Sequence, residues 1–276
     1  MTYLQTVAHA CDICGSNAFT TFITHSDYEI VQCNNCKVST TSPADYVTDS
    51  HYDATPQITE LNMRGENKTR QYARKYLGFV RRHISHGRFL DIGCSTGVFV
   101  DEANRLGYEA EGIDLDSKAI NYGKAQGRKV SYSSVESWPY REYQIVFLAH
   151  TLEHIAQPLP FLSSCVDHLS GGGYVAVIVP CHVGLHPRFF GKRWYGWLPS
   201  QHYVHYSPKA LDILFRNAGL TPISIWQNSM DHKPRFEYIH NCKDATRSIL
   251  SYSLATIGTL CGRGDQLIGI ARKRSI

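Results

Sequence analysis

Two acids and two glycines stand at a spacing that suits a nucleoside ligand. Asp91, Gly93, Ser95 and Gly97 lie in the run FLDIGCSTG, and Asp114 ends a later apolar run, GID. Glycines let the backbone approach a ligand closely, and an acid after the next strand can accept hydrogen bonds from both hydroxyls of a ribose. A dinucleotide would instead require the spacing GxGxxG for its pyrophosphate, which disfavours an NAD oxidoreductase. Because an acid opens the motif, we expect a cationic nucleoside.

Four cysteines near the N-terminus form two C-x-x-C pairs, Cys11 with Cys14 and Cys33 with Cys36, with eighteen residues between the pairs. This spacing is typical of a zinc ribbon with four thiolate ligands, which predicts a structural zinc because no coordination position stays open for a substrate. The alternative is two unrelated turns or a redox pair, although redox motifs usually come singly. The other cysteines have no pair spacing and are expected in the core or in turns: Cys94, Cys165, Cys181, Cys242 and Cys261.

Four histidines fall in segments that should project from the carboxyl edge of the same sheet, where ligands of open α/β sheets bind. Histidine is the natural base near neutral pH. His150 directly ends an expected strand, so we favour a role in lining the cofactor pocket. We expect a catalytic or substrate-binding role for one of His202 and His205, and His154 is a further catalytic candidate.

Strand and helix patterns alternate through most of the chain, and this alternation must position these residues. Strands are expected at residues 88–92, 110–114, 128–132, 143–150, 174–180, 222–227 and 266–271. Helices are expected at 62–84, 98–106, 117–126, 158–169, 208–219 and 245–260. The pattern predicts an α/β fold with a doubly wound, Rossmann-like, mostly parallel sheet of seven strands. We expect a zinc ribbon module at 1–42, a connector at 43–61 and the large domain at 62–276.

The composition agrees with one large α/β core and a small appendage, since the chain has 276 residues, of which 43% are hydrophobic. The net charge of +4 comes without a basic stripe, so a nucleic-acid partner is not expected. The sequence contains no run of eighteen apolar residues and no secretion signal at its start, which predicts a cytoplasmic protein without a membrane span. The oligomeric state stays open.

The chain resembles the class I S-adenosylmethionine-dependent methyltransferases of the ubiquinone-biosynthesis-like, or domain 23, type over roughly residues 60–276. The run FLDIGCSTG matches their acidic first motif, and Asp114 matches their ribose-binding acid. TLEHI at 151–155 is similar to the L-E-H segment after their fourth strand, and LSGGG at 169–173 to their L-x-P-G-G turn. QHYVHYS at 201–207 resembles E-H-x-x-H-[FY]-S, with Gln201 in place of the acid.

The resemblance implies S-adenosyl-L-methionine (SAM) as the cofactor. Ser134 stands where an acid usually binds the adenine amine, which weakens that contact. For Glu153 and His154 the resemblance implies a loop over the cofactor and, in ubiquinone-type enzymes, contact with a divalent metal; a hydrogen bond at a helix start is the alternative. The implied cofactor-binding residues are Asp91, Gly93, Cys94, Ser95, Gly97, Asp114, Leu115, Ser134, Val135 and His150.

An aromatic insert, HPRFFGKRWYGW at residues 186–197, is interpreted as an acceptor-binding loop in which Trp194, Tyr195 or Trp197 stacks on a sugar or planar ring. The alternative is an amphipathic lid or an interface patch. Deoxysugar C-methyltransferases with a similar zinc module use the histidine that matches His202 as a base, but they carry a further C-terminal domain that does not match this sequence, which disfavours methylation of carbon.

The sequence therefore predicts a SAM-dependent enzyme that methylates a hydroxyl of a small molecule or of a glycan or sugar-nucleotide precursor. A ribosomal-RNA methyltransferase with a zinc ribbon and a non-catalytic zinc-binding scaffold are the alternatives.

Overall fold

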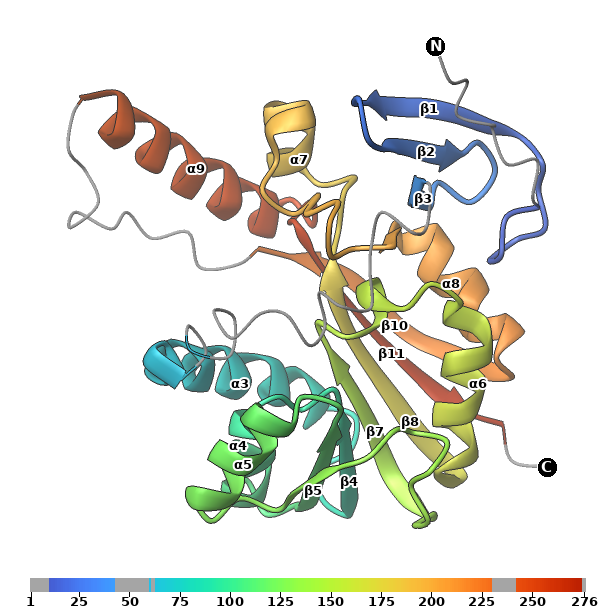
Figure 1. Cartoon of the computed structure of the whole chain (residues 1–276), viewed down its shortest axis with the longest axis vertical. Helices are drawn as coiled ribbons and strands as arrows, with labels where there is room; N and C mark the ends of the chain where they lie inside the picture. Colours follow the sequence, from blue (N-terminus) through green and yellow to red (C-terminus); the bar gives the residue numbers. More distant parts are fainter. Residues whose placement is uncertain (1–9, 43–59, 61–62, 230–241, 275–276) are drawn as a thin grey trace.

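A seven-stranded sheet lies at the centre of the molecule (Figure 1). The computed structural model describes residues 10–42, 60, 63–229 and 242–274. The strand order in the sheet is β10-β11-β8-β7-β4-β5-β6. All neighbours pair in parallel except β11, which is antiparallel to both β8 and β10. The predicted doubly wound, mostly parallel sheet is thereby confirmed. The strands are β4 (Arg88–Ile92), β5 (Glu109–Asp114), β6 (Val130–Tyr132), β7 (Tyr143–Ala149), β8 (Leu169–Pro180), β10 (Leu220–Asn228) and β11 (Gln266–Lys273).

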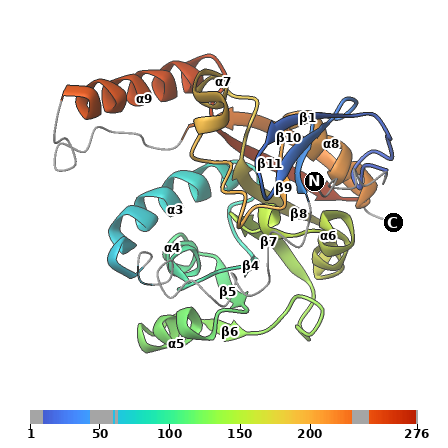
Figure 2. The same ribbon diagram turned by 45° about the horizontal axis from the view of Figure 1, so that its top comes forward.

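Helices cover both faces of this sheet (Figure 2). One face is covered by α3 (Glu66–Val80), α4 (Val98–Arg105) and α5 (Ser117–Ala125), whose buried residues form one apolar cluster with the strands. The other is covered by α6 (Pro158–Asp167) and α8 (Pro208–Asn217). Beyond the sheet edge, α7 (Leu185–Phe190) packs on α9 (Cys242–Leu260). No helix in the described part of the chain is long and apolar enough to cross a membrane.

Short polar side chains cap the first turns of two of these helices. Asp116 accepts a hydrogen bond from the backbone N–H of Ala119 and starts α5. Ser207 accepts one from the N–H of Ala210 at 3.1 Å, with Pro208 in the first turn of α8. Such caps satisfy N–H groups that have no partner inside the helix.

Residues 169–173 do not form the expected turn, because they belong to β8. Leu169 pairs with Tyr143 of β7, and the register shifts before Ile145. A Cβ atom at Gly173 would come within 3.0 Å of the Tyr143 carbonyl oxygen. The glycines therefore allow a close approach of two strands at an irregularity, which from sequence alone looks like a turn.

The N-terminal module is a small antiparallel sheet of β1 (Phe19–Thr24), β2 (Glu29–Cys33) and β3 (Ser39–Ser42). Beside it the four paired cysteines gather, with all four sulfurs within 4.8 Å of one another. Sγ of Cys11 lies 3.7 Å from that of Cys36, and Sγ of Cys14 lies 3.6 Å from that of Cys33. A tetrahedron with Zn–S bonds of about 2.3 Å has sulfurs about 3.8 Å apart. The cluster is therefore compatible with a zinc ribbon.

The module is joined to the large domain by a shared sheet and a shared core. A fourth strand, β9 (Val204–His205), pairs with β3 although it comes from the large domain. Ile13 and Val38 of the module belong to the same apolar cluster as Leu211 and Phe215 of α8. The predicted connector at 43–61 lies outside the described residues apart from residue 60, and the predicted domain boundaries stay a prediction.

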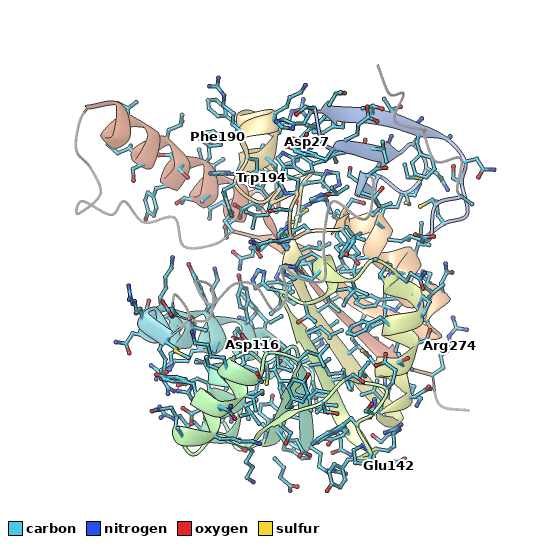
Figure 3. All side chains as sticks on the ribbon, in the orientation of Figure 1. Asp27, Asp116, Glu142, Phe190, Trp194 and Arg274 are labelled. Atoms are coloured by element: carbon cyan, nitrogen blue, oxygen red, sulfur yellow. The ribbon has the colours of Figure 1, made fainter. Side chains whose placement is uncertain are left out.

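The aromatic insert packs against this module. Trp194 and Trp197 are only 3% and 4% exposed and form a cluster with Ile23 of β1 and Ile30 of β2. Figure 3 shows Phe190 and Trp194 beside the small sheet whose β1–β2 turn carries Asp27. The expected stacking of either tryptophan on an acceptor is wrong, because both rings are buried in contacts with the N-terminal module. The alternative, an interface patch, describes them better, and the interface is within the chain.

Candidate functional site

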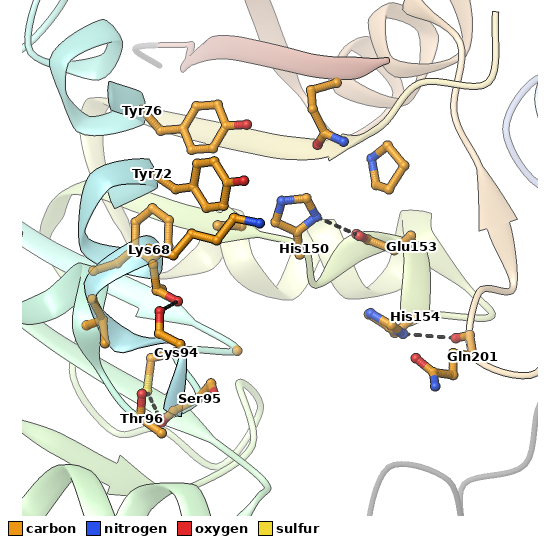
Figure 4. A pocket seen from close by; sticks show the side chains of 18 of the residues that line it. Lys68, Tyr72, Tyr76, Cys94, Ser95, Thr96, His150, Glu153, His154 and Gln201 are labelled. Carbon is orange, nitrogen blue, oxygen red and sulfur yellow. Dashed lines mark hydrogen bonds and ion pairs between the residues drawn. The ribbon is translucent and has the colours of Figure 1, made fainter. Parts of the chain in front are cut away.

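A cavity of about 820 Å³ opens at the carboxyl ends of β4 and β7 (Figure 4). Its walls come from α3, from the loops after these two strands, and from residues 195–202. The volume falls in the range of small-molecule sites, and its position is where open α/β sheets bind ligands. The predicted site residues that line it are Asp91, Gly93, Cys94, Ser95, His150, His154 and His202.

The loop after β4 is fixed by Asp114. One carboxylate oxygen of Asp114 accepts the N–H of Ser95 at 2.7 Å, and the other accepts the N–H of Asp116 at 2.8 Å. Ser95 has a positive φ of 48°, which is rare outside glycine and recurs at functional sites. Asp114 therefore shapes the first motif directly, in addition to its predicted contact with a ribose.

Gly93 is required by the packing of two loops. Its φ is +78°, and a Cβ atom there would lie 2.3 Å from Oγ1 of Thr151. Thr151 in turn donates its hydroxyl proton to the carbonyl oxygen of Ile92 at 3.0 Å. Any side chain at position 93 would push the loop after β4 away from the loop after β7, and these two loops form one wall of the cavity.

The other predicted cofactor residues do not line the cavity. Ser134 accepts a hydrogen bond from the N–H of Ser137, and Leu115 is exposed. Val135 is buried, and its carbonyl oxygen binds the ring of His168. Gly97 begins α4 with a φ of 77°. Contacts of these four residues with the nucleoside stay predictions.

His150 and Glu153 form a pair at the start of the loop after β7 (Figure 4). His150 has a positive φ of 56°, and its Nδ1 lies 3.2 Å from Oε1 of Glu153. Glu153 is 1% exposed, and its Oε2 has no hydrogen-bond partner among the described residues. Burial raises the pKa of Glu153, but the hydrogen bond and charge of His150 and the nearby rings outweigh it and lower the pKa to about 2. Glu153 is therefore a buried carboxylate.

The rings of His154 and His202 meet edge to face, with centroids 4.8 Å apart and planes at 78°. Nδ1 of His154 lies 2.9 Å from the carbonyl oxygen of Gln201, and Nδ1 of His202 lies 3.1 Å from that of Gly196. A carbonyl only accepts, so Nδ1 carries the proton in both rings and the lone pair of a neutral ring is on Nε2. Burial lowers the pKa of His202 to about 4 despite the opposing charge of Glu153, so His202 is neutral near pH 7.

Glu153, His154 and His202 together also suit a metal ion. One ligand atom from each lies within 4.8 Å of the others. Two imidazole nitrogens and a carboxylate oxygen are a common donor set for divalent transition metals, and Oε2 of Glu153, which has no hydrogen-bond partner among the described residues, is available as the carboxylate ligand. A metal held there would polarise an acceptor hydroxyl.

His205 does not line the cavity. Its Nε2 lies 3.1 Å from Oγ1 of Thr41 in the N-terminal module, and its ring packs on Trp197 with centroids 4.9 Å apart. Burial lowers its pKa well below the usual value. The structure thus brings His154 and His202 to the cavity and leaves His205 behind them.

Sequence reasoning missed the wall that α3 supplies. Lys68, Tyr72 and Tyr76 line the cavity at intervals of four residues, the spacing of one helix face. Within the helix expected at 62–84 these tyrosines have the spacing of an apolar face, which by itself does not indicate a cavity. The hydroxyl of Tyr76 and Oε1 of Gln266, from β11, are buried without hydrogen-bond partners among the described residues. Buried polar atoms are rarely left this way, so a ligand is a natural partner for both. The signal in the sequence is the tyrosine hydroxyls on an otherwise apolar face.

The chain matches known methyltransferases. Residues 64–225 match the family described as methyltransferase domain. The ubiquinone biosynthesis O-methyltransferase of Nitrosospira multiformis is 32% identical over 110 residues, which are 36% of this chain and 46% of that enzyme. The enzyme of the same name from Cereibacter sphaeroides strain ATCC 17029 is 28% identical over 153 residues, 49% of this chain and 61% of that enzyme. The chain thus spans about half the length of these curated relatives.

Solved structures share the fold at low identity. A SAM-dependent methyltransferase from Thermotoga maritima, described as a possible histamine N-methyltransferase, superposes with a TM-score of 0.54 and 16% identity over 78% of this chain and 99% of that one. A SAM-dependent methyltransferase from Archaeoglobus fulgidus gives a TM-score of 0.54 and 19% identity over 75% of this chain and 94% of that one.

The raised pKa of Asp91 leads us to expect that cofactor affinity depends on pH. Burial, with a smaller contribution from Asp114, raises the pKa of Asp91 well above its usual value, which favours the protonated carboxyl in the free protein. A cationic ligand favours the carboxylate, so binding releases the proton and affinity rises with pH, by at most about tenfold per pH unit. We expect calorimetry from pH 5 to pH 8 to show this for SAM and more weakly for S-adenosylhomocysteine, which lacks the sulfonium charge. Asp91→Asn should abolish the trend; an identical slope in that variant would contradict the assignment.

Proposed function

We propose that this chain, which belongs to the methyltransferase domain family, is a SAM-dependent enzyme that methylates a hydroxyl group of a small molecule or of a glycan or sugar-nucleotide precursor. The observation that carries this proposal is that one cavity joins the first motif, with Asp91 and Ser95, to two histidines whose lone pairs are on Nε2. A hydroxyl acceptor needs such a base, whereas many amine acceptors do not. The names of the curated relatives also favour oxygen as the methylated atom.

His202 is the base in this proposal. When bound, SAM supplies the electrophilic methyl group. The acceptor oxygen would take this methyl group while the sulfur leaves as a neutral thioether, and Nε2 of His202 would take the hydroxyl proton. The carbonyl of Gly196 holds the ring in the required tautomer, and the Glu153 carboxylate raises the pKa of His202 and so stabilises the imidazolium that forms.

The test replaces His202 by a residue that lacks the basic nitrogen but keeps the hydrogen bond to the carbonyl oxygen of Gly196. His202→Gln keeps an amide N–H for the Gly196 carbonyl and has no basic atom. We expect it to lower turnover by about 100-fold or more with SAM affinity within twofold of wild type. His154→Gln, changed in the same way, is the matched control and should cost less than about tenfold. The acceptor comes from a screen of SAM consumption with nucleotide sugars, polyketide-like phenols and RNA.

Other outcomes assign the chemistry differently. If only His154→Gln is inactive, His154 is the base. If both variants are inactive and wild-type activity disappears after a brief chelator treatment that leaves the cysteine-bound metal in place, the three residues bind a catalytic metal. Activity on RNA with a steep salt dependence would favour the ribosomal-RNA alternative, and failure to bind SAM would favour the scaffold.

We further propose that Cys11, Cys14, Cys33 and Cys36 bind one structural zinc ion. The sulfur spacing supports it, and a segment this short gains its stability from the metal. Cys36→Ser should lose zinc and at least about 2 kcal/mol of unfolding free energy, or about 4 °C or more in melting temperature, while SAM affinity changes little. Cys261→Ser, at an exposed cysteine outside the module, is the control and should match wild type. Protein purified without chelators that contains no zinc would refute the assignment.

A further inference from the structure

The segment that carries His202 is attached to the N-terminal module by several hydrogen bonds. Residue Thr41, at the end of β3, makes three hydrogen bonds to it. Its N–H donates to the carbonyl oxygen of Tyr203 at 3.0 Å, and its hydroxyl donates to that of His202 at 2.7 Å. Its Oγ1 also lies 3.1 Å from Nε2 of His205.

The directions of these bonds follow from the number of protons available. The single hydroxyl proton of Thr41 goes to the His202 carbonyl, because that oxygen can only accept. Oγ1 must then accept from His205, which places the proton of His205 on Nε2. Thr41, His202 and His205 are 4%, 4% and 3% exposed, so water cannot readily replace either bond.

Further bonds tie the same segment to the metal-binding turn. Ser207 donates its hydroxyl proton to the carbonyl oxygen of Cys36 at 2.8 Å. Lys209 donates to the carbonyl oxygen of Asn35 at 2.7 Å. β9 pairs with β3 through Ser39 with His205 and Thr40 with Val204. The backbone of residues 202–207 is thus fixed from the cysteine side, while the ring of His202 reaches the cavity.

We propose that Thr41 is a positioning residue for methyl transfer, and that the cysteine module acts on catalysis by holding His202 in place through it. The catalytic part of this inference rests on the proposed function, in which His202 is the base. The positional part does not, because the hydrogen bond from Thr41 to the carbonyl oxygen of His202 is independent of the chemical role of the His202 ring. A shift of the base by about 1 Å costs up to about 100-fold in rate.

The experiment compares Thr41→Val, which keeps the shape and removes the hydroxyl, with Thr41→Ser, which keeps the hydroxyl. Thr20→Val is the matched control, because the hydroxyl of Thr20 binds Asn34 within the module and does not contact the histidine segment. NMR of protein labelled with ¹³C at histidine Cε1 reports the environment of each ring, and His202→Gln identifies the His202 signal by its absence. Zinc content and SAM affinity are measured for every variant.

We expect Thr41→Val to shift the His202 signal and to lower turnover at saturating acceptor by about 10- to 100-fold, with zinc content and SAM affinity close to wild type. Thr41→Ser and Thr20→Val should retain the wild-type signal and turnover. Should Thr41→Val not fold, Thr41→Ala, which leaves room for a water molecule, is compared with Thr41→Ser in its place.

An unchanged His202 signal and unchanged turnover in a folded variant without the hydroxyl would overturn the proposal, and so would an equal effect of Thr20→Val. If the signal shifts while turnover is unchanged and His202→Gln is active, Thr41 positions His202 but the proposed base is wrong. The two failures are therefore distinguishable.

Discussion

The pairing of β3 with β9 is the contact on which the geometry of the site depends. β9 contains only Val204 and His205, and a strand of two residues has too few hydrogen bonds to hold a position alone. β3 supplies them on one side, and on the other Tyr206 forms a bridge with Cys181 at the end of β8. The chain around His202 is thus held between two separate sheets, so the small module is structurally part of the site.

The parts of the site that could be predicted from the sequence are local. The strand, turn and helix around Gly93 and the acid at Asp114 each depend on residues within a few positions, so the spacing of those residues indicates them. The cysteine pairs are equally informative, because tetrahedral coordination imposes a fixed spacing on each pair. His154 and His202 could be placed at one edge because both follow elements of the same parallel sheet.

The parts that could not be predicted depend on contacts between distant segments. Trp194 and Trp197 have the residue types of a ligand-binding site, but the N-terminal module buries both rings. The residues next to them in the sequence do not indicate this contact. Tyr76 follows the periodicity of a core residue, while its hydroxyl faces a cavity formed by strands far along the chain. His202 and His205 are three residues apart in one motif, yet only the fold decides that one lines the cavity and the other binds Thr41.

The charges around the cavity fit the proposed proton transfer. Methyl transfer turns the positive sulfonium into a neutral thioether, and the proton released by a hydroxyl acceptor makes His202 positive, so the charge moves without being lost. A buried imidazolium is costly, as the lowered pKa of His202 indicates, unless an anion is close. The Glu153 carboxylate lies beside that ring before the reaction begins, so no rearrangement is needed when the charge arrives.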